Sequence, residues 1–151
     1  IYFSTSYVYP GSTGNYKEND AVLPWNNYAW SKLGGECAVQ MYKNSLILRV
    51  CMTERPFVHK KAFANIKLNF IFHEDLANIL LKILEKKGII NIGGPTKSVY
   101  NFAKKHNSEV KKIFIKKYAK GNFPLKPFMN LSKLKKIIRK NINYESNKYT
   151  I

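Results

Sequence analysis

The sequence predicts an α/β fold built on a parallel sheet. Two apolar runs rich in β-branched and aromatic residues, 1–9 and 45–51, flank a stretch with helical spacing at 27–43. A third apolar run, 88–92, follows a second helical stretch, 73–87. A strand, a helix and a strand in this order form a βαβ unit, in which the second strand returns parallel to the first.

The first three elements each have a local signal. Residues 1–9 end at Pro10 and Gly11, which predicts a buried strand stopped by a turn. Inside the helical stretch, Gly34 and Gly35 each cost about 1 kcal/mol relative to Ala, so we expect the backbone to approach a neighbour closely there. Arg49 lies within the apolar strand 45–51 and therefore needs a buried acceptor.

The second half of the chain gives weaker signals. The stretch 73–87 has acidic residues in its first turn and lysines in its last, and we expect Gly88 to end it. The remaining expected elements are an apolar run at 70–72, a strand at 88–92, a turn at 93–95, a Ser-capped helix at 98–106, an edge strand at 112–117, a helix at 130–140 and a frayed tail from 144.

The formal charge of +17 raises the alternative of a nucleic-acid binder. Residues 1–58 carry a net charge of +1 and residues 59–151 a net charge of +16, with 23 Lys against 3 Arg in the whole chain. Because Arg reads bases and phosphates better than Lys does, its scarcity disfavours a nucleic acid as partner. We interpret the lysines as solvated products of an AT-rich coding sequence, and an anionic partner stays as the alternative.

The cysteines and the apolar segments indicate the compartment. Cys37 and Cys51 lack CxxC spacing and stand in apolar contexts, which predicts buried, reduced thiols. No apolar run is long enough to span a bilayer and the amino terminus does not resemble a signal peptide, so we expect a cytoplasmic protein without a membrane partner. The three histidines lack the spacing of metal ligands, and we expect no metal.

The spacing of Tyr28 and Lys32 carries the chemistry. Residues four apart share one face of a helix, so the ammonium of Lys32 stands beside the phenol of Tyr28 and favours transfer of its proton. Thr5 lies at the carboxyl end of the first predicted strand, and parallel sheets bind their ligands outside these ends. A Tyr and a Lys four residues apart also occur by chance on exposed helices, so the pair gains meaning only from this setting.

The runs FSTSYVYPG, NNYAWSKLGGE, LILR, FIFHEDLA and GIINIGG resemble the extended short-chain dehydrogenase/reductase superfamily, in the branch that contains dTDP-4-dehydrorhamnose reductase and nucleotide-sugar epimerases. The resemblance implies the carboxyl-terminal part of a Rossmann-like, doubly wound parallel sheet with a small substrate-binding region. Ser6 stands where the family has an acidic residue, and Lys126 stands where an Arg is usual. On this basis we divide the chain into the catalytic second half of the Rossmann-like domain at 1–56, a substrate-side region with the remaining Rossmann elements at 57–143, and a tail at 144–151.

The resemblance also implies the reaction and its residues. A hydride passes from NADPH or NADH to carbon 4 of a 4-keto-6-deoxy nucleotide sugar, while Tyr28 gives the proton and Thr5 holds the oxygen. The cofactor would lie against Tyr28, Lys32, Cys51 and Met52, and the substrate against Thr5, Ser6 and Tyr7.

The glycine-rich GxxGxxG turn that such enzymes use for the pyrophosphate does not occur in the chain, and the first residue is Ile rather than Met. We therefore expect a preceding half to be missing. The glycines at 93–94 are interpreted as a turn after a strand rather than a phosphate loop. Three alternatives stay open, namely an epimerase or dehydratase, a non-catalytic subunit of such an enzyme, and the nucleic-acid binder. A second copy of the chain or a full-length homologue is the expected protein partner.

Overall fold

Three parallel strands form the main sheet in the computed structural model, which describes residues 1–115 and 123–139. They are β1 (Tyr2–Thr5), β2 (Leu46–Val50) and β7 (Gly88–Ile92), in the order β1-β2-β7. All five residues of β2 are buried, as befits the middle strand of a parallel sheet. The predicted α/β class and the parallel βαβ unit are confirmed.

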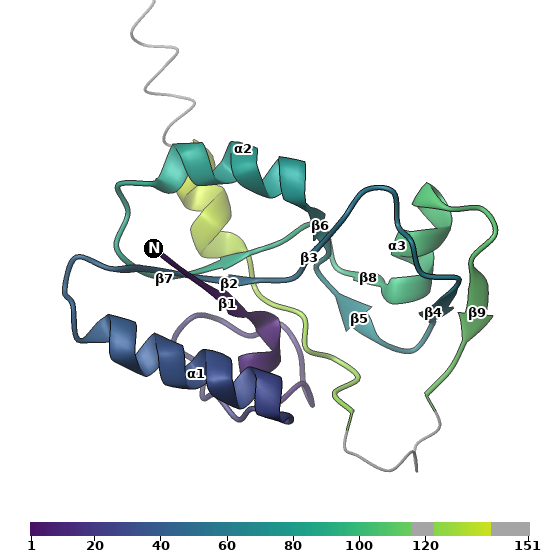
Figure 1. Ribbon diagram of the computed structural model, residues 1–151, viewed down its shortest axis with the longest axis horizontal. Helices are drawn as coiled ribbons and strands as arrows, with labels where there is room; N and C mark the ends of the chain where they lie inside the picture. The colour runs from purple at the N-terminus through teal and green to yellow at the C-terminus, as the bar shows by residue number, and fades with distance from the viewer. Residues whose placement is uncertain (116–122, 140–151) are drawn as a thin grey trace, which may run out of the picture.

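Helices cover both faces of this sheet. Helix α1 (Asn27–Gln40) lies on one face, while α2 (His73–Ile83) and a helix at residues 132–139 lie on the other (Figure 1). The side chain of Asn26 caps α1 by accepting from the backbone N–H of Ala29 at 2.7 Å. This arrangement is the doubly wound sheet that the sequence predicts.

The core between the sheet, α2 and the last helix is aliphatic. Residues from β2 and β7 meet apolar residues from both helices there, and burial of these side chains stabilises the layer. The buried members are Leu46, Leu48, Val50, Ile71, Leu76, Ile83, Ile90, Ile92 and Leu134.

A smaller region stands beside the carboxyl ends of the main strands (Figure 1). Its described residues form one helix and three two-stranded pairings, of which the pairing of residues 67–68 with 97–98 is antiparallel and the other two are parallel. Its elements are β3 (Met52–Thr53) with β6 (Ile71–Phe72), β4 (Lys61–Phe63) with β9 (Lys111–Ile113), β5 (Lys67–Leu68) with β8 (Lys97–Ser98), and α3 (Val99–His106).

Several boundaries differ from the predictions. The strand expected over 1–9 stops at Thr5, because the Thr5 side chain accepts from the backbone N–H of Tyr7 and turns the chain into the 3₁₀ helix η1 (Ser6–Val8). The helix expected over 27–43 ends at Gln40. Gly88 does not end α2, which stops at Ile83; with a φ of 78° it starts β7 instead.

Other predictions concern the second half. Ser98 caps α3, as expected, and the edge strand is present at Lys111–Ile113. The strand predicted at 112–117 extends to residues 116–117, which lie outside the described residues. The last residue of the helix predicted at 130–140 and the predicted tail lie outside them as well. Among the described residues, no helix combines the length and the apolar character needed to cross a membrane.

Candidate functional site

A cavity of about 280 Å³ opens at the carboxyl ends of β1 and β2. It brings together every residue that the sequence assigned to the site, namely Thr5, Ser6, Tyr7, Tyr28, Lys32, Cys51 and Met52. Five further residues that the sequence interpretation did not assign also line it, namely Phe3, Ser4, Val50, Phe70 and His73.

Helix α1 presents Tyr28 and Lys32 from its first two turns. The Tyr28 side chain is 53% exposed. The Lys32 ammonium donates to the backbone oxygen of Phe3 at 3.0 Å, and the Tyr2 hydroxyl donates to the backbone oxygen of Lys32 at 3.3 Å. Lys32 is therefore fixed against β1 while Tyr28 stays accessible to a ligand.

The tip of β1 presents two buried hydroxyls to the same cavity. Thr5 Oγ1 accepts from the backbone N–H of Tyr7 at 3.2 Å, which leaves its own proton free to be donated. Ser6 is 1% exposed, and its hydroxyl lies beside the Cys51 thiol without a hydrogen bond of normal geometry to any described residue. A buried, unsatisfied hydroxyl is costly, and a ligand oxygen in the cavity would satisfy it.

Burial sets the charge state of two other lining groups. It raises the pKa of the Cys51 thiol to about 12. Burial, and then the nearby Cys51 and Tyr28, raise the pKa of Tyr7 well above its usual range. Both groups are therefore neutral near pH 7. Among the described residues, no Asp or Glu lines the cavity. Lys32 is the one lysine in this lining, and no carboxylate of the lining neutralises its positive charge.

A buried ion pair lies behind the cavity. The Arg49 guanidinium contacts the Glu36 carboxylate through Nη2 and Oε2 at 2.7 Å and through Nε and Oε1 at 3.0 Å. The Ser4 hydroxyl donates to the same carboxylate. The acceptor that Arg49 was expected to need is therefore Glu36 on α1. Although burial opposes its charged form, the hydrogen bond to Glu36 raises the pKa of Arg49.

The pair continues into a network across the sheet. Arg49 Nη1 donates to the hydroxyl of Tyr9 at 2.8 Å, and that hydroxyl donates to Asn91 Oδ1 on β7 at 2.9 Å. The Asn91 side-chain amide donates to the backbone oxygen of Tyr16 at 2.9 Å. The network joins α1, all three main strands and the loop after η1, so the helix that carries Tyr28 is fixed relative to the strand tip that carries Thr5.

Gly35 allows α1 to approach β1 closely. A Cβ at this position would lie 2.1 Å from the Tyr2 hydroxyl oxygen. The close approach that the sequence predicts is therefore present at Gly35. It is absent at Gly34, where a Cβ would meet nothing within 4 Å.

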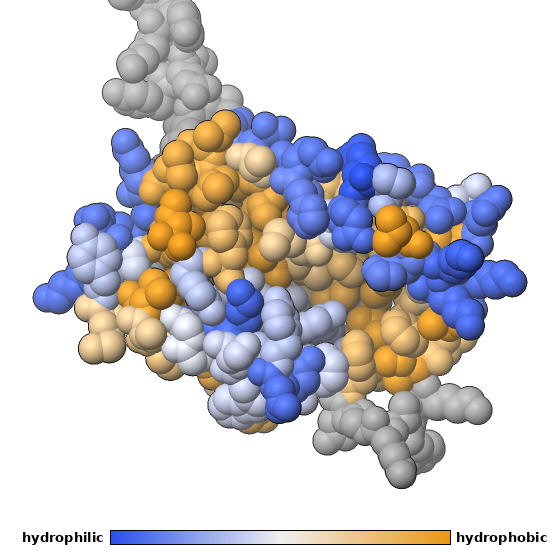
Figure 2. Space-filling model, in the orientation of Figure 1, coloured by the Kyte–Doolittle hydropathy of each residue, from blue (hydrophilic) through white to orange (hydrophobic). Residues whose placement is uncertain are grey.

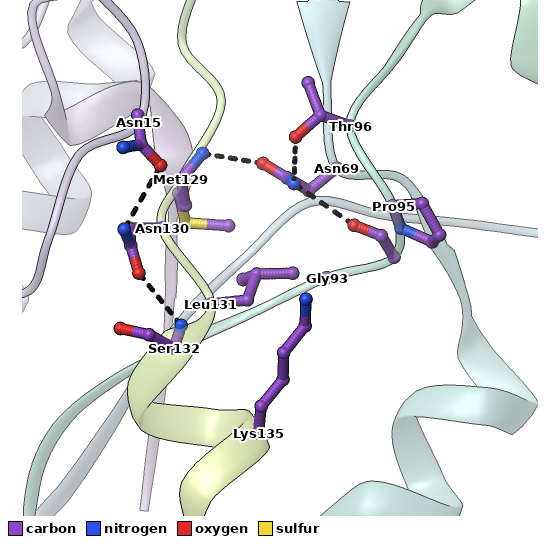
Figure 3. Close-up of a pocket in the computed structure, with 11 residues that line it drawn as sticks. Asn15, Asn69, Gly93, Pro95, Thr96, Met129, Asn130, Leu131, Ser132 and Lys135 are labelled. Atoms are coloured by element: carbon purple, nitrogen blue, oxygen red, sulfur yellow. Dashed lines mark hydrogen bonds between the residues drawn. The ribbon is translucent and has the colours of Figure 1, made fainter.

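A second cavity, of about 430 Å³, lies beyond the end of β7 (Figure 3). The turn at 93–95 forms one wall, as the sequence predicts a turn there, and Lys135 points into the space from the last helix (Figure 3). Buried Asn69 shapes the wall, because its amide donates to Gly94 O and Thr96 Oγ1 while its Oδ1 accepts from the backbone N–H of Met129.

The thiol prediction was wrong for one cysteine. Cys37 is exposed, because it follows Glu36 on α1 and Glu36 is the residue turned towards the sheet; Cys51 is buried as expected. His73, one of the three histidines without metal-ligand spacing, is the first residue of α2 and also lines the cavity at the carboxyl ends of β1 and β2. The position of His73 directly after the apolar run 70–72 was the sequence signal that could have placed it at this cavity. Within the described residues no group of three or more His, Cys, Asp or Glu is arranged to hold a metal ion.

The amino-terminal part of the chain matches a family model. Residues 1–66 match the family described as the RmlD substrate binding domain. No protein of curated function matches the chain.

Solved structures share the fold. A hypothetical dTDP-4-dehydrorhamnose reductase from Sulfolobus tokodaii is 30% identical, with a TM-score of 0.75 over 89% of this chain and 56% of that one. The dTDP-4-dehydrorhamnose reductase of Bacillus anthracis, solved with NADP, is 20% identical, with a TM-score of 0.74 over 89% of this chain and 57% of that one. The UDP-glucuronic acid 4-epimerase of Bacillus cereus, solved with NAD, is 21% identical, with a TM-score of 0.69 over 91% of this chain and 54% of that one. The chain thus spans little more than half the length of these proteins.

Proposed function

We propose that this chain, whose residues 1–66 match the RmlD substrate binding domain, carries the proton-transfer and substrate side of a nucleotide-sugar reductase of the extended short-chain dehydrogenase/reductase superfamily. The substrate class is a 4-keto-6-deoxy sugar linked to a nucleotide. The observation that carries the proposal is the shared cavity, which Thr5, Tyr28 and Lys32 all line.

Each of the three side chains has a role in the proposal. The Tyr28 phenol gives its proton to the oxygen on carbon 4, and the Thr5 hydroxyl donates a hydrogen bond to that same oxygen. Lys32, one helical turn from Tyr28 on the same face of α1, holds the ribose hydroxyls of the cofactor. The exposure of Tyr28 and the spare proton on Thr5 support these roles.

The cavity suits the nicotinamide half of a cofactor. Lys32 and Tyr28 offer polar groups for a ribose, while Val50 and Met52 offer apolar contact for a flat ring. A bound NADPH or NADH supplies the hydride that reduces carbon 4. Buried Cys51, neutral and next to Met52, keeps that wall uncharged. No GxxGxxG stretch occurs among the 151 residues, so the fit concerns the nicotinamide side alone.

Binding can be tested on the chain itself. Reduced nicotinamide mononucleotide lacks the pyrophosphate and adenosine that a glycine-rich turn would hold, so it probes this cavity alone. We expect saturable binding that Lys32→Met weakens at least ten-fold, whereas Lys43→Met, on the exposed turn after α1, leaves it unchanged. Absence of binding, or equal loss in both variants, contradicts the assignment of Lys32.

Turnover is tested in the complete gene product with NADPH and a 4-keto-6-deoxy nucleotide sugar. We expect Tyr28→Phe to lower kcat by roughly 10²- to 10⁴-fold, because the proton donor is lost. Tyr42→Phe removes a hydroxyl from an exposed tyrosine outside the cavity and serves as the control. If Tyr28→Phe retains full turnover, Tyr28 is not the proton donor.

Two further functions have specific support. The fold shared with the Bacillus cereus epimerase favours an epimerase as the alternative, which would interconvert nucleotide sugars without net consumption of NADPH.

In the described residues, β1 pairs on one side only, which favours a subunit that adds a strand from a second copy or a full-length homologue. Light scattering after gel filtration decides this last point, since a stable monomer at all concentrations contradicts it.

A further inference from the structure

A basic groove of about 500 Å³ lies in the smaller region, between β5 with β8, the start of α3, and β9. It shares no lining residue with the cavity of Tyr28. Figure 2 shows hydrophilic side chains over the upper and outer part of the smaller region and a hydrophobic area below them. The groove is lined by Ala64, Lys67, Thr96, Lys97, Ser98, Asn101, Lys112 and Phe114.

The fold assembles the three lysines from three separate strands. β5 pairs with β8, with Lys67 opposite Ser98, so Lys67 and Lys97 lie on neighbouring strands. Lys112 comes from β9, more than a dozen residues later. Three lysines from three separate strands therefore line one groove. Lysines spread evenly over the surface would not need to meet in this way.

The neutral polar groups of the groove have protons left to donate. Thr96 Oγ1 already accepts from the side-chain amide of Asn69 at 3.0 Å, and Ser98 Oγ accepts from the backbone N–H of Asn101 at 3.1 Å. Each hydroxyl proton is without an acceptor among the described residues. Together with three ammonium groups, these hydroxyls give the lining more donors than acceptors, since Asn101 alone among its side chains adds an amide oxygen, so a complementary ligand is rich in acceptor oxygens.

The positive charge of the groove is not neutralised within the described residues. Among the described residues, no Asp or Glu lines the groove. The two ion pairs of the described residues, Arg49 with Glu36 and Arg55 with Asp75, lie outside it. At the end of α3, burial and then Lys105, Arg55 and Lys97 lower the pKa of His106, so positive charge also surrounds the helix that borders the groove. An anion therefore gains Coulomb energy on entering the groove.

An aromatic platform stands beside the charges. The Lys112 ammonium lies 5.5 Å from the ring centroid of Tyr100 and 5.5 Å from that of Phe114. The Phe114 side chain lines the groove and is 61% exposed. A flat group next to a bound phosphate would have an exposed ring to stack on.

We propose that this groove binds the diphosphate of a small molecule through Lys67, Lys97 and Lys112, with Phe114 contacting an attached flat group. Three lysines match the two to three negative charges of a diphosphate. The absence of Arg from the lining and the small volume of the groove favour such a ligand over a nucleic acid. The site stands apart from the proposed reductase cavity and does not depend on it.

The test compares two triple variants of equal net charge by calorimetry with inorganic pyrophosphate. K67Q/K97Q/K112Q removes the lysines of the groove, and K43Q/K86Q/K87Q removes three exposed lysines outside it. We expect binding of one pyrophosphate per chain to weaken at least ten-fold in the first variant and less than two-fold in the second. F114A should weaken the binding of ADP by a larger factor than it weakens the binding of pyrophosphate, because only ADP carries a flat group.

Three outcomes overturn the proposal. They are equal loss in both triple variants, absence of saturable binding, and binding of duplex DNA that is tighter than that of pyrophosphate and equally reduced by both variants. If the groove variant fails to fold, amide chemical shifts of the unaltered chain decide the question. Pyrophosphate must then shift the amides of Lys97, Ser98 and Asn101, and a response confined to Lys32 and its neighbours contradicts the proposal.

Discussion

The Arg49 guanidinium and the Glu36 carboxylate form a buried ion pair with Nη2 2.7 Å from Oε2, which joins the central strand β2 to α1. Glu36 lies two turns after Tyr28 on the same helix, and Ser4, which donates to Glu36, directly precedes Thr5 on β1. The pair therefore connects the two elements that carry the proposed proton-transfer groups, and its loss would move them relative to each other.

Loss of one partner of this pair should be strongly destabilising. Arg49→Leu leaves the Glu36 charge buried without its partner, and we expect the free energy of unfolding to fall by about 3–5 kcal/mol. Arg55→Leu is the matched control, because its contact with Asp75 is 3.6 Å long and more than half exposed, for which about 0–1 kcal/mol is expected. Urea unfolding followed by tryptophan fluorescence measures both, and similar losses would contradict the role of burial.

The adjacent glycines of α1 should respond to alanine in opposite directions. At Gly34 a Cβ meets open space, so Gly34→Ala should stabilise the chain by about 0.5–1 kcal/mol through helix propensity. At Gly35 a Cβ would collide with the Tyr2 ring, so the ring must move and its hydrogen bond to Lys32 is lost. Thermal unfolding should therefore rank Gly34→Ala above Gly35→Ala, and the difference should vanish in a Tyr2→Ala background.

Much of the main sheet could be predicted because its signals are local and strong. Strands β2 and β7 have five residues each and lie within the apolar runs predicted at 45–51 and 88–92, and the helix between the first two strands fixes their parallel direction. The need of Arg49 for a buried acceptor also followed from its apolar neighbours. The acceptor itself did not follow, because the sequence does not show which face of α1 is buried.

The smaller region was largely beyond sequence reasoning. Strands β3, β5, β6 and β8 have only two residues each, too few to show an alternating pattern, and their partners lie far away in the chain. Tertiary contacts decide such elements. The exposure of Cys37 was missed for a related reason, since a thiol in an apolar stretch of helix is buried only if it lies on the face turned towards the sheet.

The turn after β7 should tolerate no side chain at its first glycine. A Cβ on Gly93 would lie 2.4 Å from the backbone oxygen of Asn69, and that backbone is fixed by a hydrogen bond from the Gly94 N–H at 3.1 Å. Gly93→Ala should therefore lower the free energy of unfolding by roughly 1–3 kcal/mol, as overpacking does. An unchanged urea midpoint would show that the turn can shift away from Asn69.

The two cysteines should differ in reactivity and in their effect on stability. Only the thiolate is alkylated, and burial raises the pKa of Cys51 to about 12, while Cys37 is exposed. At pH 8, iodoacetamide should modify Cys37 rapidly and Cys51 only when the protein opens, which peptide mass spectrometry resolves. Equal rates at both positions would contradict the burial of Cys51.

The same difference fixes the pH dependence of stability that Cys51 contributes. In the unfolded chain the thiol titrates near 9.0, whereas the folded state keeps its proton to about pH 12. Between these values the unfolded state binds fewer protons, so stability is fully present below pH 9 and falls as the pH rises, by about 1.4 kcal/mol per pH unit. Cys51→Ala removes this contribution, so between pH 9 and 10.5 the variant should lose less stability than the unaltered chain. Parallel loss in both would mean that the buried thiol ionises as readily as a free one.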